Sequence, residues 1–291
     1  MAEGWDVGGA QALQTWAPTA GAAVAALVAA WPEHVPAARL REVRSATAEA
    51  VGAGALPAPA GPDDPGEVPS LAVLTFAEQL AADVTSIADG QREAFAAATS
   101  PAAHEVALAA AVADAVSRAR AVLDGLFGPG PWDDADPAPT AHLRWLVAEL
   151  GREVALIGVL DPVTVELVRL RVARRIGSRV GMARRSLDAV RAGADAATFA
   201  AVDHYRSSSL SEVRCAALGL ADAALRTPAG VRPADLEGAR RHLRPAEAVA
   251  VVLVALVAGL DKAAVALGTD EPDGDGIQLF VLDESGDVCF P

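Results

Sequence analysis

The chain has only two cysteines in 291 residues, Cys215 and Cys289. Two thiols so far apart in the sequence exclude a disulfide framework and a thiolate metal site. The first residues, Met-Ala-Glu-Gly-Trp-Asp, also lack the basic start of a secretory signal. These absences together predict a cytoplasmic protein whose thiols stay reduced.

Lysine and aromatic residues are scarce as well. Lys262 is the single lysine, and aromatic side chains make up 4% of the chain. The formal net charge of −14 argues against nucleic acid as a partner, because a phosphate backbone would be repelled. Hydrophobic residues nevertheless reach 52%, so the interior must consist mainly of Ala, Val and Leu. These small side chains suit closely packed helices, and alanine has the highest helix propensity.

Apolar runs long enough to span a membrane are also lacking. The most apolar run, Ala248–Leu260, has 13 residues and lies between Glu247 and Asp261. A transmembrane helix needs about 20 apolar residues. The run therefore predicts a buried core helix, and no membrane is expected as a partner.

Signals for metals and cofactors are absent too. No glycine-rich phosphate loop occurs, and the histidines lack the spacing of metal ligands. We therefore expect neither a metal ion nor a cofactor. The five histidines are His34, His104, His142, His204 and His242.

Helical periodicity dominates what is present, and no internal run alternates convincingly as a strand does. Asp161-Pro162 is a typical helix start, and Ser209-Leu-Ser-Glu212 fits a capping box. The pattern predicts an all-α protein. The predicted helices are Ala20–Trp31, Pro36–Val51, Ser70–Ala82, Ile87–Ala98, Ala102–Leu126, Thr140–Ile157, Pro162–Ile176, Val180–Ala192, Ala196–Tyr205, Ser211–Leu225, Arg232–His242 and Pro245–Leu267.

Two Pro/Gly-rich breaks, Gly54–Pro69 and Gly128–Pro139, divide the helical pattern. The second break predicts a boundary between two tandem lobes. The acidic tail contains I-Q-L-F-V-L-D, then Glu-Ser-Gly, then D-V-C-F-P, which predicts a short C-terminal β-hairpin. The predicted organisation is a first lobe (1–127), a linker (128–139), a second lobe (140–268) and the tail (269–291).

The two lobes also look like repeats of one another. A shift of 144 residues places Arg118 on Lys262, and a shift of 125 places V-R-S-A-T-A-E-A-V-G (43–52) on V-R-L-R-V-A-R-R-I-G (168–177). The first lobe therefore lacks 19 residues, which correspond to the part carrying Arg185. We infer an internal duplication.

Four segments in the second lobe carry a family resemblance. In order they are L-V-R-L-R-V-A-R-R-I-G, A-R-R-S-L-D-A-V-R-A-G, S-L-S-E-V-R-C-A-A-L-G-L-A-D-A-A-L and E-A-V-A-V-V-L-V-A-L-V-A-G-L-D-K. Residues 162–267 resemble the AhpD-like alkylhydroperoxidase and carboxymuconolactone decarboxylase superfamily. The resemblance implies an AhpD-like helical bundle and oligomers built by packing helical faces together.

In the redox branch of that superfamily the working residues have the form E-x11-C-x2-C-x3-H. The same spacing here gives Glu166, Ser178, Gly181 and Arg185, so the glutamate is kept while both cysteines and the histidine are replaced. Serine forms no disulfide, glycine has no side chain, and arginine is no base near neutral pH. Thiol peroxidase chemistry is therefore excluded at this site, which the resemblance implies is vestigial.

Two hypotheses concern what these residues do instead. The resemblance brings Glu166 and Arg185 together, so they could form an ion pair across the old site. Alternatively, Arg185 and Ser178 hold a carboxylate or phosphate of a small anionic ligand. The surrounding arginines are expected to pair with acidic neighbours or with other subunits.

Three functions follow from these hypotheses. The replaced motif favours a non-catalytic protein with a binding or assembly role, acting through self-association or a protein partner. The first alternative is a non-redox enzyme of decarboxylase or isomerase type, acting on a small anionic substrate through Glu166, Ser178 and Arg185. The second is an antioxidant thiol peroxidase that uses Cys215 or Cys289.

Overall fold

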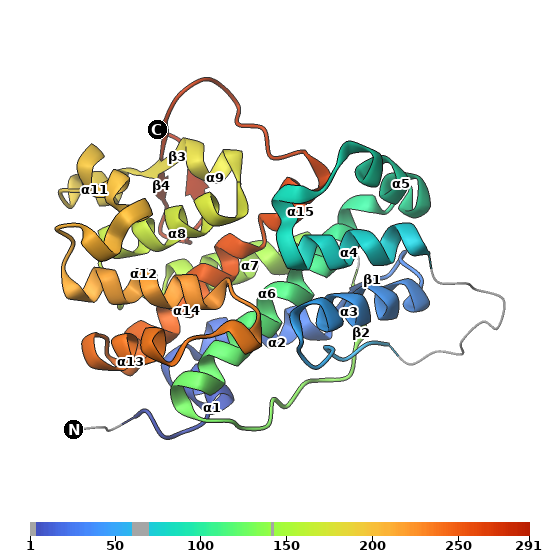
Figure 1. Cartoon of the computed structure of the whole chain (residues 1–291), viewed down its shortest axis with the longest axis horizontal. Coiled ribbons are helices and arrows are strands. Elements are labelled where there is room, and N and C mark those ends of the chain that lie inside the picture. Colours follow the sequence, from blue (N-terminus) through green and yellow to red (C-terminus); the bar gives the residue numbers. More distant parts are fainter. Residues whose placement is uncertain (1–3, 60–69, 141–142) are drawn as a thin grey trace.

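The protein is all-α, as the periodicity predicts, with a small β element near its C-terminus (Figure 1). The computed structural model describes residues 4–59, 70–140 and 143–291. Residues 60–69 of the predicted break and residues 141–142 of the predicted helix Thr140–Ile157 lie outside these ranges.

Helices occupy both halves of the chain. The first half contains α1 (Gly9–Trp16), α2 (Pro18–Ala29), α3 (Ala37–Val51), α4 (Leu71–Asp83), η1 (Val84–Ser86), α5 (Asp89–Thr99) and α6 (Ala103–Phe127). The second half contains α7 (Leu143–Ala155), α8 (Pro162–Ile176), α9 (Arg179–Ala183), α10 (Leu187–Arg191), α11 (Ala196–Ala200), η2 (Ala201–Ser207), α12 (Glu212–Ala224), η3 (Pro228–Gly230), α13 (Pro233–His242), α14 (Pro245–Gly259) and α15 (Lys262–Leu267).

The strands are short and lie in two small sheets. They are β1 (Ala30–Pro32), β2 (Ala138–Thr140), β3 (Arg184–Ser186), β4 (Gln278–Leu282) and β5 (Val288–Cys289). β1 pairs in parallel with β2, whereas β4 pairs in parallel with β3 and antiparallel with β5. The pair β4–β5 is the predicted C-terminal hairpin.

One predicted helix, Val180–Ala192, is wrong. The helix α9 ends at Ala183, and Arg184–Ser186 is extended as β3 before α10 begins. The partner of β3 is β4, in which Gln278 pairs with Arg184. Pairing with a segment almost a hundred residues away overrides the local helical preference, which is only a weak determinant of structure.

There are three smaller differences between the predicted and the observed helices. The helix α1 is absent from the prediction, and the predicted helix Ala20–Trp31 ends at Ala29 because Trp31 pairs with Pro139 in the β1–β2 sheet. The predicted helix Pro245–Leu267 is divided into α14 and α15 at Leu260-Asp261. This last break places Asp261 at the corner between the two helices, where it keeps exposed surface.

The helix bounds agree with the 125-residue shift. Adding 125 to both ends of α3 gives 162 and 176, the ends of α8, and both helices stop at a glycine with positive φ, 67° at Gly52 and 74° at Gly177. The packing also corresponds, since α3 contacts α4 and α6 while α8 contacts α12 and α14. These correspondences favour the predicted duplication. The elements α9 to α11 have no counterpart in the first half among the described residues.

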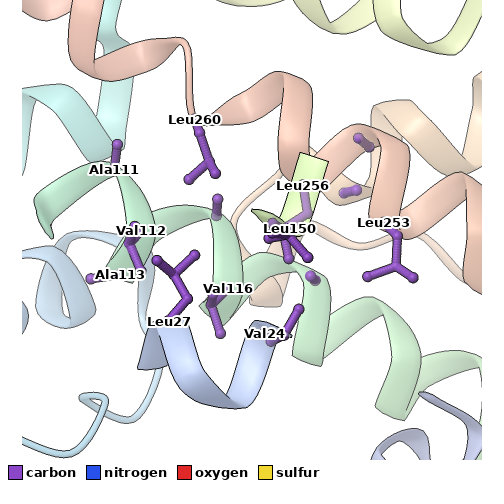
Figure 2. Packing of buried hydrophobic residues seen from close by; sticks show 14 of the residues in the cluster. Val24, Leu27, Ala111, Val112, Ala113, Val116, Leu150, Leu253, Leu256 and Leu260 are labelled. Atoms are coloured by element: carbon purple, nitrogen blue, oxygen red, sulfur yellow. The ribbon is translucent and has the colours of Figure 1, made fainter. Parts of the chain in front are cut away.

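The hydrophobic core is continuous between the halves. Figure 2 shows Val24 and Leu27 of α2 and Val116 of α6 close to Leu150 of α7 and Leu256 of α14. The apolar segment Pro245–Leu267 is long enough to cross a membrane by length and composition, but 78% of an apolar 18-residue window within it is buried in the fold. The run Ala248–Leu260 is thus a core segment, as predicted.

One buried polar cluster lies where α6 meets α15. Asp114 accepts from Arg118 Nε at 2.7 Å and from Lys262 Nζ at 2.6 Å, and all three side chains are at most 8% exposed. Burial lowers the pKa of Lys262, and the charge of Asp114 opposes this change. The two basic residues that the 144-residue shift aligns therefore share one carboxylate.

Candidate functional site

A cavity of about 880 Å³ lies between α7, α8, α14 and the C-terminal hairpin β4–β5. Its volume falls within the range of about 300–1,000 Å³ that is usual for small-molecule sites. Beyond α15 the chain arches along one edge of the molecule and returns to β3, as Figure 1 shows. The hairpin thereby closes one side of the cavity.

Most of the cavity wall is apolar. The helices contribute valine, leucine and alanine side chains, and the hairpin adds Phe280, Leu282 and Val288. The hairpin turn fits closely on α7, because a Cβ at Gly286 would lie 3.0 Å from the Arg152 carbonyl oxygen. The apolar wall residues from the helices include Leu108, Val147, Ala148, Val154, Ala155, Val165, Ala173, Ala250, Val254, Val257 and Ala258.

Asp261 lines the cavity in the break between α14 and α15, near Arg169 and Arg184, whose charges act on it. We call these three residues the polar end of the cavity. The Asp261 side chain has surface open to the cavity, while protein surrounds it on its other sides. Ser178 Oγ donates to Asp261 Oδ2 at 3.0 Å. Burial raises the pKa of Asp261, and the charge of Asp270 adds to this rise, whereas the Ser178 hydrogen bond and the charges of Arg169 and Arg184 oppose it.

Ser178 and Gly181, two of the four predicted site residues, build the turn into α9. The backbone N–H of Gly181 donates to Ser178 Oγ at 3.0 Å, which caps the helix. A Cβ at Gly181 would lie 2.7 Å from Ala173 Cβ, so only glycine allows α9 to approach α8 this closely. The acceptor of the Ser178 proton is Asp261, not Glu166.

Glu166 lines the cavity but is bound to Arg169. Two hydrogen bonds of 2.8 Å join the carboxylate to the Arg169 guanidinium. The same guanidinium donates to the carbonyl oxygens of Gly181 at 2.9 Å and Arg184 at 2.7 Å. This ion pair therefore joins α8 to α9 and β3.

The hypothesis of a Glu166–Arg185 ion pair is wrong. Arg185 donates to the carbonyl oxygens of Met182 at 2.7 Å and Arg184 at 2.6 Å, and its guanidinium lies over the Phe199 ring. The reason is β3, because successive side chains of a strand point to opposite sides. Arg184 therefore lines the cavity, and Arg185 does not.

Arg184 has spare hydrogen-bonding capacity at the cavity. Its Nε is buried without a hydrogen-bond partner among the described residues, and its guanidinium lies over the Phe290 ring with 4.9 Å to the centroid. The cavity wall near Asp261 thus includes the Arg184 guanidinium, which donates no hydrogen bond to the other described residues. For the rival hypothesis of an anion site at Arg185 and Ser178, Arg184 is the better candidate, because Arg184 lines the cavity and Arg185 does not.

Neither cysteine lines the cavity. The thiol of Cys215 donates to the Tyr205 carbonyl oxygen at 3.3 Å, and burial raises its pKa, which disfavours the thiolate. Cys289 is exposed in β5. Among the described residues, no three His, Cys, Asp or Glu side chains gather as metal ligands.

Sequence reasoning missed Asp261 and Arg184. A signal for Asp261 was present, because it is an acidic residue inside a strongly apolar segment that the composition places in the core. The sequence could not show which of Arg184 and Arg185 faces the cavity, because a helix and a strand orient neighbouring side chains differently.

Comparison with known proteins gives two relatives. The chain is 32% identical over 261 residues to the uncharacterized proteins MT2376 and Rv2313c of Mycobacterium tuberculosis, from strains CDC 1551 and H37Rv. Each match covers 85% of this chain and 90% of the relative. No family model matches the chain, and no solved structure matches it.

Proposed function

The chain belongs to the family of the mycobacterial protein Rv2313c, and we propose that its function is to bind a small, largely apolar molecule in the cavity beside Asp261. The observation that carries this proposal is the cavity itself, about 880 Å³ with an apolar wall and one polar end. Sites for small molecules combine such walls with a few polar groups that orient the ligand.

We also propose that the second half is a degenerate AhpD-like unit. The proposal is supported by the packing of α9 against α8, which brings Glu166 and Gly181 to the cavity wall and Ser178 to Asp261. The chain departs from the family pattern at Arg185, which stands in a strand. The cavity therefore takes the place of a redox centre.

A non-redox enzyme is the second candidate, and Asp261 is the observation that favours it. An acidic residue with a raised pKa at the polar end of an apolar cavity is typical of catalytic sites. In this proposal the polar group of the substrate meets Arg184. Self-association, a protein partner and a cytoplasmic location stay predictions.

A helix glycine allows the binding proposal to be tested. Gly151 of α7 lines the cavity, and a Cβ there would have only Val257 nearby, at 4.0 Å. The variant Gly151→Leu should occupy part of the cavity without a clash. Gly238→Leu is the matched control, because Gly238 of α13 has open space around its Cβ position and does not line the cavity.

The probe is the neutral dye N-phenyl-1-naphthylamine, whose fluorescence rises in apolar surroundings. We expect the wild type and Gly238→Leu to bind it equally, and Gly151→Leu to bind with a Kd raised at least about tenfold, a loss of about 1.4 kcal/mol. Equal binding by all three proteins, or binding by none, would contradict the proposal. Both variants exchange a helix glycine for leucine, so their helix propensities change alike.

A further inference from the structure

We infer that Asp261 is a catalytic residue that accepts a proton from carbon, and that the cavity takes apolar carbonyl compounds with an acidic C–H beside the carbonyl group. The inference rests on the proposed function, since the substrate has to enter the cavity. It adds a reaction and a substrate class to the binding site. The geometry around Asp261 and Arg184 carries it.

A hydrogen bond positions the Asp261 carboxylate and leaves one of its oxygens able to accept a proton. Ser178 binds Oδ2 at 3.0 Å, and Oδ1 has no hydrogen-bond partner among the described residues. The adjacent Lys262 points the other way, toward Asp114. The carboxylate therefore presents one free oxygen to a cavity whose wall is largely apolar.

Three charged residues on different elements face Asp261, and two of them already form ion pairs with other residues. On α8, Arg169 is engaged by Glu166. On the chain after α15, Asp270 binds the side chain of Arg179 at 3.1 Å and its backbone N–H at 2.7 Å. On β3, Arg184 keeps its Nε free.

A proton transfer at this site balances without a co-reactant. The Asp261 carboxylate takes the proton from the carbon beside the carbonyl, and the C–H electron pair forms a C=C bond. The carbonyl π pair moves to oxygen, where the Arg184 guanidinium stabilises the negative charge. In a β,γ-unsaturated carbonyl compound the enolate is conjugated with the existing C=C bond, so return of the proton to the γ carbon places the double bond beside the carbonyl and the overall reaction is an isomerisation.

An apolar substrate in the cavity covers the exposed surface of Asp261, and the lower solvation makes this carboxylate a stronger base than a surface aspartate. In water a carboxylate is a weak base for carbon acids, because water stabilises its charge. An apolar wall removes that stabilisation and raises the pKa, which brings the base closer to the pKa of its substrate. The same wall holds the hydrocarbon part of the substrate.

The test uses 5-nitrobenzisoxazole, a flat apolar carbon acid that needs no cofactor. Removal of its ring C–H proton converts the C–H pair into the third bond of a nitrile while the N–O bond breaks, so the ring opens to a single coloured product, a cyano-nitrophenolate. We expect Asp261→Asn to lower the rate by about 10²-fold or more, the usual contribution of a positioned base. Asp203→Asn is the matched control, since Asp203 is an exposed aspartate that does not line the cavity and forms an ion pair with Arg174.

The pH profile is a second readout. The rate should rise with pH as Asp261 loses its proton, with a midpoint above 3.8, the ordinary value for aspartate. Ser178→Ala keeps the base but removes a hydrogen bond that lowers its pKa, so the midpoint should move to higher pH. This variant also keeps the inference testable if Asp261→Asn fails to fold, because an unmoved midpoint would contradict it.

Dye binding to the same proteins separates the two proposals. If N-phenyl-1-naphthylamine binds but Asp261→Asn is as fast as the wild type, the catalytic inference fails and the binding proposal stands. If the dye does not bind, the binding proposal and the inference both fail. A rate lost in Asp261→Asn with dye binding retained supports both.

Discussion

Asp261 and Lys262 are neighbours in the chain, but their side chains lie in different surroundings. Lys262 is enclosed with Arg118 around Asp114, whereas Asp261 borders the cavity and binds Ser178. The break between α14 and α15 turns the two side chains apart. Lys262 therefore contributes to the stability of the core, whereas Asp261 supplies a polar group to the candidate site.

The stability role of Asp114 can be measured. Asp114→Asn keeps the shape but leaves two buried cations without their carboxylate, so we expect a loss of about 3–5 kcal/mol in the free energy of unfolding. Asp188→Asn breaks an exposed ion pair with Arg191 and should cost less than about 1 kcal/mol. Urea unfolding followed by circular dichroism gives both values, and equal losses would contradict this account of the cluster.

At the scale of the element, the C-terminal hairpin forms one wall of the cavity. The strand β4 covers the cavity with Phe280, which is 7% exposed, and pairs with β3. An ion pair between Arg152 and Asp287, 3.3 Å apart, also joins the hairpin to α7. A segment at the end of the chain thus shapes a site whose other walls come from α7, α8 and α14.

Removal of the hairpin should therefore weaken binding without unfolding the helices. We expect a chain ending at Gly274 to keep its helical circular dichroism and to bind N-phenyl-1-naphthylamine with a Kd raised at least about tenfold. The physical reason is that Phe280, Leu282 and Val288 no longer shield the ligand from water. Unchanged dye affinity would show that the hairpin is not part of the site.

At the scale of the whole molecule, the two halves are joined through one core. Leu253, Leu256 and Leu260 are at most 5% exposed and belong to the same cluster as the buried residues of α6. Exposing three such leucines costs roughly 4–9 kcal/mol, at about 1.5–3 kcal/mol each. That loss is comparable with the whole stability of a domain, about 5–15 kcal/mol.

A fragment experiment follows from this shared core. We expect residues 128–291 alone to show no cooperative unfolding transition in urea, while the full chain shows one. Addition of a fragment covering residues 1–127 should restore the transition, because it supplies α6. A sharp transition of the isolated second half would show that the predicted lobe 140–268 is stable by itself.

Much of the architecture could be predicted from the sequence. The start of α8 follows from Asp161, which accepts from the N–H groups of Val163 and Thr164, and its end follows from Gly177. The bounds of α3 and α8 agree with the predicted repeat because local signals of this kind set them. The site was predictable in part, since Glu166 and Gly181 line the cavity and Ser178 borders it through Asp261.

The sequence by itself determined the all-α class, most helix bounds, the hairpin and the buried apolar helix, because periodicity and capping act within a few residues. Only the tertiary structure decided that Arg184–Ser186 is a strand, that Arg184 rather than Arg185 lines the cavity, and that Asp261 meets Ser178. These features depend on contacts between segments about 80 to 95 residues apart. No local pattern contains that information.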